Sequence, residues 1–345
     1  MHAHLFRKLV GDVDAAARPG DLVAVETPQG ELLGHGLFNP RAEIAVRMLT
    51  FGPIPPGIEF WKEKLQRAVE LRRDMLKLDA AGDAYRVIHA EADGLPGLVI
   101  DRYGDVLSAE VFSLAMYQRS AALLECLGQM LGTKHTLVQI PAQTHGQEGF
   151  QAEPVRSPGL PEDVVVTEFG TRFRVRFEEG HKTGFFCDQR DNRRRLAEIC
   201  TGRTVLDLCC YTGGFAVQAK RLGNATDVTA VDLDEKAIAI ARENAHLNQQ
   251  KINFVHADAF GYMRHDRQWP NIRRRRPRSA EVDPQPARAR RRDQNSSRFE
   301  PAGHPTGGRR RPVLELHLFG TLGRSRIPAA PANCRTAGRQ AATVG

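Results

Sequence analysis

A short apolar run that ends in a glycine-rich turn decides much of what this chain can fold into. The run reads V-L-D-L-C-C-Y-T-G-G-F, from Val205 to Phe215. An acid ends the next apolar run, at Asp232 in T-A-V-D-L-D, and another follows at Asp258 in F-V-H-A-D-A-F. A strand, a glycine-rich turn, a helix and a second strand ending in an acid form the arrangement by which an α/β sheet holds an adenosine.

The turn favours S-adenosylmethionine over a nicotinamide dinucleotide, because it reads D-x-x-x-x-x-G-G and lacks G-x-G-x-x-G. We expect Asp207 to accept a hydrogen bond from a ligand amine or a bridging water. Gly213 and Gly214 are expected to let the backbone approach the ligand. We expect Asp232 to bind both ribose hydroxyls and Asp258 to accept from the adenine amino group.

Two adjacent glycines alone would indicate only a tight strand-to-helix turn, which occurs in any α/β protein. The acids at matching positions after the following strands favour a more specific interpretation. We therefore predict an α/β chain with a Rossmann-like class I methyltransferase sheet.

Four longer motifs carry a family resemblance that covers roughly residues 5–265. The chain resembles the bacterial 23S rRNA cytosine-C5 methyltransferases that carry an amino-terminal PUA domain. The motifs are K-T-G-F-F-x-D-Q-R-D-N-R from Lys182, L-D-L-x-C-Y-T-G-G-F from Leu206, E-x-D-G-L-P-G-L-x-x-D-R-Y from Glu91 and G-x-G-x-x-N-P-R from Gly34.

The resemblance implies S-adenosylmethionine as the cofactor, large-subunit rRNA as the partner and a homodimer as one possible assembly. In such enzymes a cysteine thiolate attacks C6 of cytosine, so that C5 becomes nucleophilic enough to accept a methyl group. The resemblance places the K-T-G-F-F segment beside the methionine end of the cofactor or the target base. It implies pocket positions for Phe186, Asp188, Gln189, Arg190, Cys209 and Tyr211. A solvated helix face is the competing interpretation for Arg190, Arg193, Arg194 and Arg195.

Strand, helix and turn signals divide the chain into units. Residues 1–76 predict a small PUA-like β-barrel followed by a helix over 60–78, with Arg41 and Arg47 as candidate RNA contacts or simply exposed arginines. Residues 80–175 predict an α+β middle domain with a helix over 116–131 and a hairpin near 164–178. Residues 185–268 predict the cofactor-binding half of a methyltransferase sheet that stays incomplete. The acids Glu91, Asp93 and Asp101 are expected to serve turns and interdomain contacts.

Residues 271–345 differ in composition from everything before them. They contain 17 arginines, no lysine and 5 acidic residues, whereas residues 1–270 contain 32 basic and 36 acidic residues. The formal net charge of +8 therefore comes from this tail and is no sign of a basic surface elsewhere.

The composition changes where the sheet still lacks strands. The family's D-P-P motif and catalytic cysteine belong there, and neither occurs in this reading frame. Codons can be chosen for these residues so that a reading frame shifted by one nucleotide encodes other peptides. In that shifted frame residues 273–277 give V-V-V-D-P and residues 298–311 end in V-A-D-G-G. Residues 314–331 begin W-S-C-T-C-S-G. Since these resemble three family motifs in family order, we predict a frameshifted, disordered or non-native Arg/Pro-rich tail and an inactive or impaired chain. The competing interpretation is a genuine disordered arm that binds RNA.

Other function classes stay open or are disfavoured. Related enzymes methylate guanine N7 and share the K-T-G-F-F segment, and a non-catalytic RNA-binding protein would need no cysteine. The six cysteines lack zinc spacing, which predicts reduced thiols, a cytoplasmic location and no metal site. No apolar run reaches the roughly 20 residues of a membrane span, and no signal peptide is recognisable. The first expected strand lies close to the start, which suggests a shortened amino end.

Overall fold

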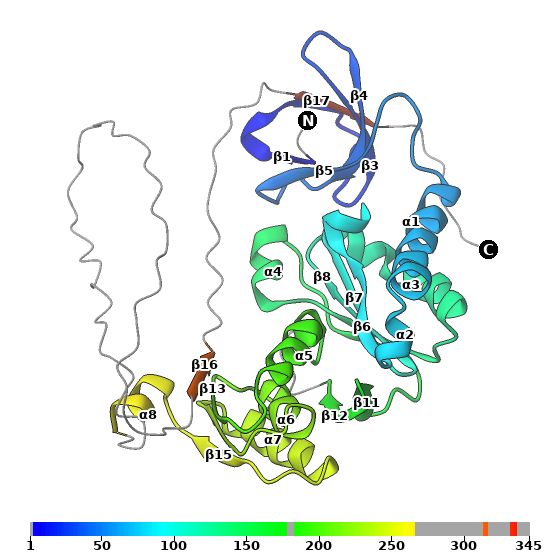
Figure 1. The fold of residues 1–345 in the computed structure, drawn as a ribbon. Helices are drawn as coiled ribbons and strands as arrows, with labels where there is room; N and C mark the ends of the chain where they lie inside the picture. The colour runs from blue at the N-terminus through cyan, green and yellow to red at the C-terminus, as the bar shows by residue number, and fades with distance from the viewer. Residues whose placement is uncertain (1–2, 178–182, 266–312, 317–331, 337–345) are drawn as a thin grey trace, which may run out of the picture.

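The computed structural model describes residues 3–177, 183–265, 313–316 and 332–336. Three units follow one another down the molecule (Figure 1). We call them the amino-terminal unit, the middle unit and the parallel-sheet unit. The remaining residues, which include most of the proposed frameshifted tail, lie outside the described residues.

The amino-terminal unit is a six-stranded sheet in the order β1-β5-β4-β3-β17-β2. Apolar side chains alternate along its strands, so one face forms a small core that includes Val23, Val25 and Phe38. Its elements are β1 (His4–Phe6), η1 (Arg7–Leu9), β2 (Val10–Val13), β3 (Leu22–Glu26), β4 (Leu32–Phe38), β5 (Ile44–Phe51) and β17 (Ala332–Thr336).

The middle unit has a five-stranded sheet in the order β10-β9-β8-β7-β6, with helices packed on one face. This is the expected α+β arrangement. The strands are β6 (Ala84–His89), β7 (Leu98–Tyr103), β8 (Val106–Val111), β9 (His135–Gln139) and β10 (Val155–Arg156). The helices are α1 (Ile58–Glu70), η2 (Leu71–Met75), α2 (Leu78–Ala81), η3 (Ala90–Asp93), α3 (Leu114–Leu131) and α4 (Ala142–Glu148).

Helix α1 packs with the middle unit. Its buried residues Leu65, Ala68 and Val69 belong to the same core as Met116 and Leu123 of α3. The expected single helix over 60–78 instead turns into the π-helical η2, and Lys77 adopts a left-handed conformation with φ of 53°. We therefore propose a unit boundary in the loop before α1 instead of at residue 76.

The parallel-sheet unit begins with an antiparallel hairpin, β11 (Asp163–Glu168) and β12 (Thr171–Arg176), at the expected place. The hairpin shares a core with the helices that follow, through Val166, Phe173 and Val175. The helices are η4 (Cys187–Gln189), α5 (Arg190–Glu198), α6 (Gly214–Arg221), α7 (Glu235–Leu247) and α8 (Ala259–His265). The parallel sheet runs β15-β14-β13-β16, with β13 (Thr204–Leu208), β14 (Asp227–Asp232), β15 (Asn253–His256) and β16 (Val313–Leu316).

Two short segments of the tail form strands, where we expected no native-like structure. Strand β16 pairs in parallel with β13, and β17 pairs with β2 and β3 in the amino-terminal sheet. A disordered tail is therefore wrong for these two segments, whereas a non-native tail stays a prediction. The pairing covers backbone groups that β13 would otherwise leave unpaired at an open edge.

Candidate cofactor site

Three acids stand where parallel strands β13, β14 and β15 end. Asp207 lies near the end of β13, Asp232 ends β14, and Asp258 follows β15. The register pairs Leu208 with Val231 and Asp232 with His256, so the carboxyl ends of the strands meet at one edge of the sheet. Ligands of open α/β sheets bind at this edge.

The turn after β13, residues 209–214, is here called the cofactor turn. Its residues Cys209, Tyr211 and Gly213 have φ of 61°, 50° and 77°. Left-handed backbone is strained for a bulky residue such as tyrosine, and such strain gathers at ligand sites. A glycine-rich sequence does not by itself predict that two non-glycine residues adopt it.

The two glycines of the turn also serve protein packing, while their close approach to a ligand stays a prediction. A Cβ on Gly213 would lie 3.1 Å from the Cβ of Ala241 in α7. A Cβ on Gly214 would lie 3.1 Å from Cδ of Arg193 in α5. The glycines therefore let α5 and α7 close around the turn.

Asp207 is 4% exposed, and its Oδ2 accepts from the backbone N–H of Ala216 at 3.1 Å. Burial and, to a lesser extent, the nearby Asp232 raise the pKa of the Asp207 carboxyl to about 7, against the opposing effect of the Ala216 N–H. A cationic group that binds beside Asp207 would favour its charged form. This fits the expected contact with a ligand amine.

The carboxylates of Asp232 and Asp258 accept hydrogen bonds from backbone N–H groups. Asp232 accepts from the N–H of Tyr211 at 2.7 Å and from that of Asp234 at 2.9 Å. Asp258 is exposed and accepts from the N–H of Gly261 at 2.6 Å, at the start of α8. A carboxylate has about four acceptor positions, so each acid can still bind a ligand hydroxyl or amine.

Residues 183–190, here called the cofactor segment, lie beside the cofactor turn. The Phe186 and Tyr211 rings meet edge to face with centroids 5.1 Å apart. Gln189 is half-buried next to them and Asp188 is exposed. Arg190 is 9% exposed, pairs with Asp191 at 3.0 Å and lies over the Phe169 ring. The structure thus brings Phe186 and Tyr211 together, as predicted for the methionine end of the site, whereas Arg190 lies at the β11–β12 hairpin.

Buried hydrogen bonds fasten the cofactor segment to the middle unit. The Tyr103 hydroxyl donates to the carbonyl of Phe185 at 2.9 Å and accepts from the Phe185 N–H at 3.0 Å. The Thr183 hydroxyl donates to Asp101 at 2.5 Å, and Ser108 donates to the Thr183 carbonyl at 2.8 Å. Strands β7 and β8 therefore set the position of the segment.

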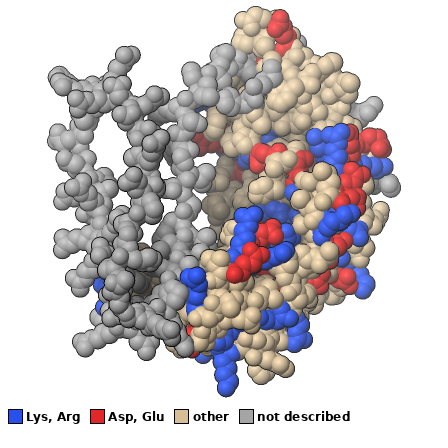
Figure 2. Space-filling model, in the orientation of Figure 1, with Lys and Arg blue, Asp and Glu red and all other residues tan. Residues whose placement is uncertain are grey.

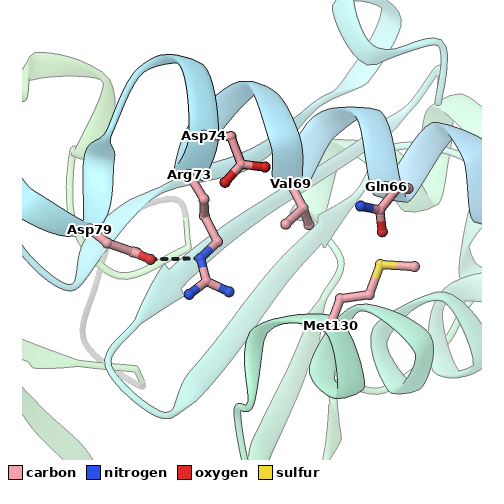
Figure 3. A pocket seen from close by; sticks show the side chains of 6 residues that line it. All are labelled: Gln66, Val69, Arg73, Asp74, Asp79 and Met130. Atoms are coloured by element: carbon pink, nitrogen blue, oxygen red, sulfur yellow. Dashed lines mark hydrogen bonds and ion pairs between the residues drawn. The ribbon is translucent and has the colours of Figure 1, made fainter.

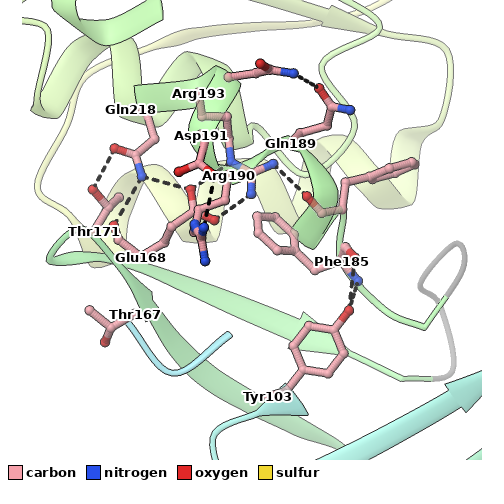
Figure 4. Close-up of polar contacts among 12 residues, drawn as sticks. Tyr103, Thr167, Glu168, Thr171, Phe185, Gln189, Arg190, Asp191, Arg193 and Gln218 are labelled. Atoms are coloured by element: carbon pink, nitrogen blue, oxygen red, sulfur yellow. Dashed lines mark hydrogen bonds and ion pairs between the residues drawn. The ribbon is translucent and has the colours of Figure 1, made fainter. Parts of the chain in front are cut away.

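A buried ion pair fastens the same segment to the parallel-sheet unit (Figure 4). Arg193 is 2% exposed and Glu168 is 1% exposed, and they form a two-pronged pair at 2.8 and 2.5 Å. Arg193 also donates to the Phe186 carbonyl at 3.0 Å and lies over the Phe185 ring, and Gln218 donates to Glu168. A solvated face is thus wrong for Arg193.

The remaining arginines of α5 differ from one another. Arg194 is 57% exposed, pairs with Glu198 and lies over the Phe169 ring. Arg195 is exposed. A solvated face therefore describes Arg194 and Arg195, whereas Arg190 and Arg193 are buried. Helical spacing does not predict this split, because both Arg193 and Arg194 share a helix face with Arg190.

The candidate RNA contacts of the amino-terminal unit are engaged within the chain. Arg47 donates to Glu148 of α4 at 2.8 Å and to the Phe112 carbonyl at 3.3 Å, with only 11% of its side chain exposed. Arg47 is therefore an interunit contact, which corrects its assignment to RNA. Arg41 donates to the Gly149 carbonyl at 3.1 Å but is exposed. Glu91 likewise pairs with His4, as expected for an interdomain contact.

The cysteines near the site do not suit nucleophilic attack, which needs a thiolate. Burial raises the pKa of the Cys187 thiol well above its usual range, and Asp101 raises it further. Burial and Asp207 raise the pKa of Cys210 likewise. Burial and Asp232 raise the pKa of the more exposed Cys209. A pocket-lining role for Cys209 stays a prediction.

The donors and acceptors at this edge fit S-adenosylmethionine. Three carboxylates stand at the strand ends, and the Thr212 hydroxyl is buried with no hydrogen-bond partner among the described residues. An amine, two ribose hydroxyls and a purine amino group offer the donors that such acceptors lack. Within the described ranges no three His, Cys, Asp or Glu side chains gather as a metal site. No helix there is long and apolar enough to cross a bilayer.

Comparisons with known proteins agree with the fold and with S-adenosylmethionine as the cofactor. Residues 148–289 match the S-adenosylmethionine-dependent methyltransferase family and residues 2–51 match the PUA-like domain family. The chain is therefore an S-adenosylmethionine-dependent methyltransferase by family, with a PUA-like unit at its amino end.

Two curated relatives show which methyltransferase family this is. "Ribosomal RNA large subunit methyltransferase I" of Serratia proteamaculans is 34% identical over 269 residues, which are 76% of this chain and 67% of that protein. The protein of the same name from Escherichia coli K12 is 32% identical with the same coverage. The chain belongs to this family of methyltransferases.

Two solved structures share the fold. One is a SAM-dependent methyltransferase from Streptococcus mutans, with a TM-score of 0.62 and 22% identity over 74% of this chain. The other, SMU.776 complexed with SAH, has a TM-score of 0.63 and the same identity. This chain covers 66% of each of those chains.

The Asp232 carboxylate can be tested by substitution. We expect Asp232→Ala to weaken binding of S-adenosylhomocysteine by roughly 1.5–3 kcal/mol, because a charge-assisted hydrogen bond to the ribose is lost. Calorimetry on a frame-corrected protein measures this. Asp232→Asn keeps an acceptor for the turn and separates ligand binding from turn geometry. Asp227→Ala, at the exposed opposite end of β14, is the control and should change nothing. Equal affinities for all variants would remove Asp232 from the site.

Proposed function

We propose that the intact form of this protein transfers a methyl group from S-adenosylmethionine to large-subunit rRNA and forms 5-methylcytosine. The observation that carries the proposal is a site for S-adenosylmethionine in a chain whose relatives are named large-subunit rRNA methyltransferases. The sulfonium of the cofactor supplies an electrophilic methyl group. The protein would work in the cytoplasm, where rRNA matures.

The cofactor would be held by the acids at the strand ends, the cofactor turn and the cofactor segment. In this proposal Asp207 binds the amine of the methionine part, Asp232 the ribose and Asp258 the adenine. The cofactor turn contributes backbone and side chains from Cys209, Tyr211, Gly213 and Gly214, and the cofactor segment contributes Phe186, Asp188, Gln189 and Arg190. Support comes from the shared sheet edge and from the Phe186–Tyr211 contact.

The rRNA would dock through the amino-terminal and middle units, a proposal that rests on the PUA-like match and on the exposed Arg41. Net charge offers no support, because basic and acidic side chains are interspersed on the face shown in Figure 2. We propose three units, with the first boundary before α1 and the second before the β11–β12 hairpin, and a separate tail after about residue 268.

Guanine-N7 methylation is the competing activity, because N7 is nucleophilic without covalent help. The cysteine-bearing motif recovered in the shifted frame favours cytosine C5. That motif does not occur in the frame of this chain, and the described cysteines near the site have raised pKa values that disfavour a thiolate.

The product identifies the activity. A frame-corrected protein is incubated with unmodified large-subunit rRNA and isotopically labelled S-adenosylmethionine, and the nucleosides are then separated by mass spectrometry. We expect label in 5-methylcytidine. Label in 7-methylguanosine would establish the competing activity, and cofactor binding with no labelled nucleoside would indicate a non-catalytic RNA-binding protein.

A further inference from the structure

On one face of the middle sheet, successive rows of cross-strand neighbours contact different parts of the molecule. Strands β7, β8 and β9 align Tyr103, Val106 and His135 in one row, Asp101, Ser108 and Leu137 in the next, and Val99, Glu110 and Gln139 in the third. Tyr103, Val106 and Leu137 join the core of the parallel-sheet unit, and Asp101 and Ser108 bind Thr183. The third row continues past the cofactor segment.

A cavity of about 850 Å³ opens over this third row. Its volume lies within the roughly 300–1,000 Å³ of small-molecule sites. Phe112, Ile140, Pro141 and Pro154 line it, and so does Phe186 of the cofactor segment. Because the Phe186 ring contacts Tyr211 of the cofactor turn, the cavity adjoins the methionine end of the proposed cofactor site.

The polar lining suits a nucleobase better than a phosphate. Arg86 is the basic residue of the lining, and Asp101 already neutralises it through contacts of 2.9 and 3.0 Å. Glu110 adds a carboxylate. The side-chain oxygen of Gln139 is buried and has no hydrogen-bond partner among the described residues, while its nitrogen donates to Phe177. The cavity therefore offers acceptors to a ligand that carries an amino group.

We propose that this cavity binds a cytosine base of a single-stranded RNA segment, an inference that rests on the proposed function and names its substrate site. Phe112 and Phe186 supply aromatic surfaces on which a base can stack. Glu110 and Gln139 accept from the exocyclic amine, the contact that a carboxylate makes with cytosine N4. An enzyme that modifies a base takes it out of its stack into such a pocket.

The test measures RNA affinity and not turnover. Fluorescently labelled hexacytidylate and hexauridylate are titrated with the full chain at about 0.3 M salt, which weakens phosphate-only contacts. We expect the cytidine hexamer to bind more tightly. Phe112→Ala should weaken it roughly 5- to 150-fold, the range of one base–aromatic stacking interaction. Glu110→Gln should reduce the preference for cytidine over uridine.

The control pocket lies on the helical side of the middle sheet. It measures about 350 Å³ and is lined by residues of α1, η2, α2 and α3, including Gln66, with an Arg73–Asp79 ion pair at 2.6 Å (Figure 3). Gln66→Ala should leave RNA affinity unchanged. The tail is identical in all variants, so its contribution cancels in each comparison.

Binding of S-adenosylhomocysteine, measured on the same preparations, separates the two proposals. Intact cofactor binding together with hexamer affinities within twofold of the parent for Phe112→Ala and Glu110→Gln would overturn the cavity assignment alone. An equal loss in Gln66→Ala would overturn it as well. Absent cofactor binding in the folded parent chain would instead count against the proposed function.

Discussion

Replacing Arg193 by methionine is expected to destabilise the protein by roughly 3–5 kcal/mol, the largest stability effect among the substitutions considered. Glu168 would keep a buried negative charge with no cation to compensate it, and that desolvated charge is the source of the cost. The contact from Arg193 to the Phe186 carbonyl would also be lost, so the cofactor segment would loosen. Urea unfolding followed by circular dichroism measures the change.

Helix α5 offers a matched control. Arg194→Met removes an arginine one position along, where the side chain is exposed and its pair with Glu198 contributes only about 0.3–0.5 kcal/mol. Adding Glu168→Gln to Arg193→Met should recover part of the lost stability, because it removes the uncompensated charge. Equal unfolding midpoints for Arg193→Met and Arg194→Met would show that the buried pair does not hold the two elements together.

The strands and the acids at their ends could be read from the sequence, because they follow local rules. Strand and turn signals predicted a small β-barrel in the region where β3, β4 and β5 lie. The acid at the end of β14 follows from its place after an apolar run. Strand ends and turns depend on neighbours in the chain, so one sequence suffices to find them.

The features that the sequence did not predict depend on contacts between residues far apart in the chain. Arg193 stands among five other charged residues of α5, and only its pairing with Glu168 shows that it is buried. Arg47 similarly meets Glu148 from about a hundred positions away. The left-handed Tyr211 is held by Asp232, 21 residues further along. None of these pairs leaves a local pattern in the sequence.

The reading frame of the tail is expected to decide whether the protein is active. The chain as written is expected to give no detectable 5-methylcytosine in large-subunit rRNA, because the family's D-P-P motif and catalytic cysteine are absent from this frame. Restoring the frame near residues 264–272 should produce the modification. That difference, from none to measurable turnover, is the largest expected effect on activity. Nucleoside mass spectrometry on rRNA treated with each form measures it.

A measurement of cofactor binding shows whether an inactive form lacks only the nucleophile or also the cofactor site. Asp207, Asp232, the cofactor turn and the cofactor segment all precede the proposed shift, so both forms should bind S-adenosylhomocysteine if each folds. In the restored form, alanine in place of the recovered cysteines should abolish transfer and spare cofactor binding. Methylation of cytosine by the chain as written would disprove the frameshift. The nucleophile would then have to be sought among Cys187, Cys209 and Cys210, despite their raised pKa values.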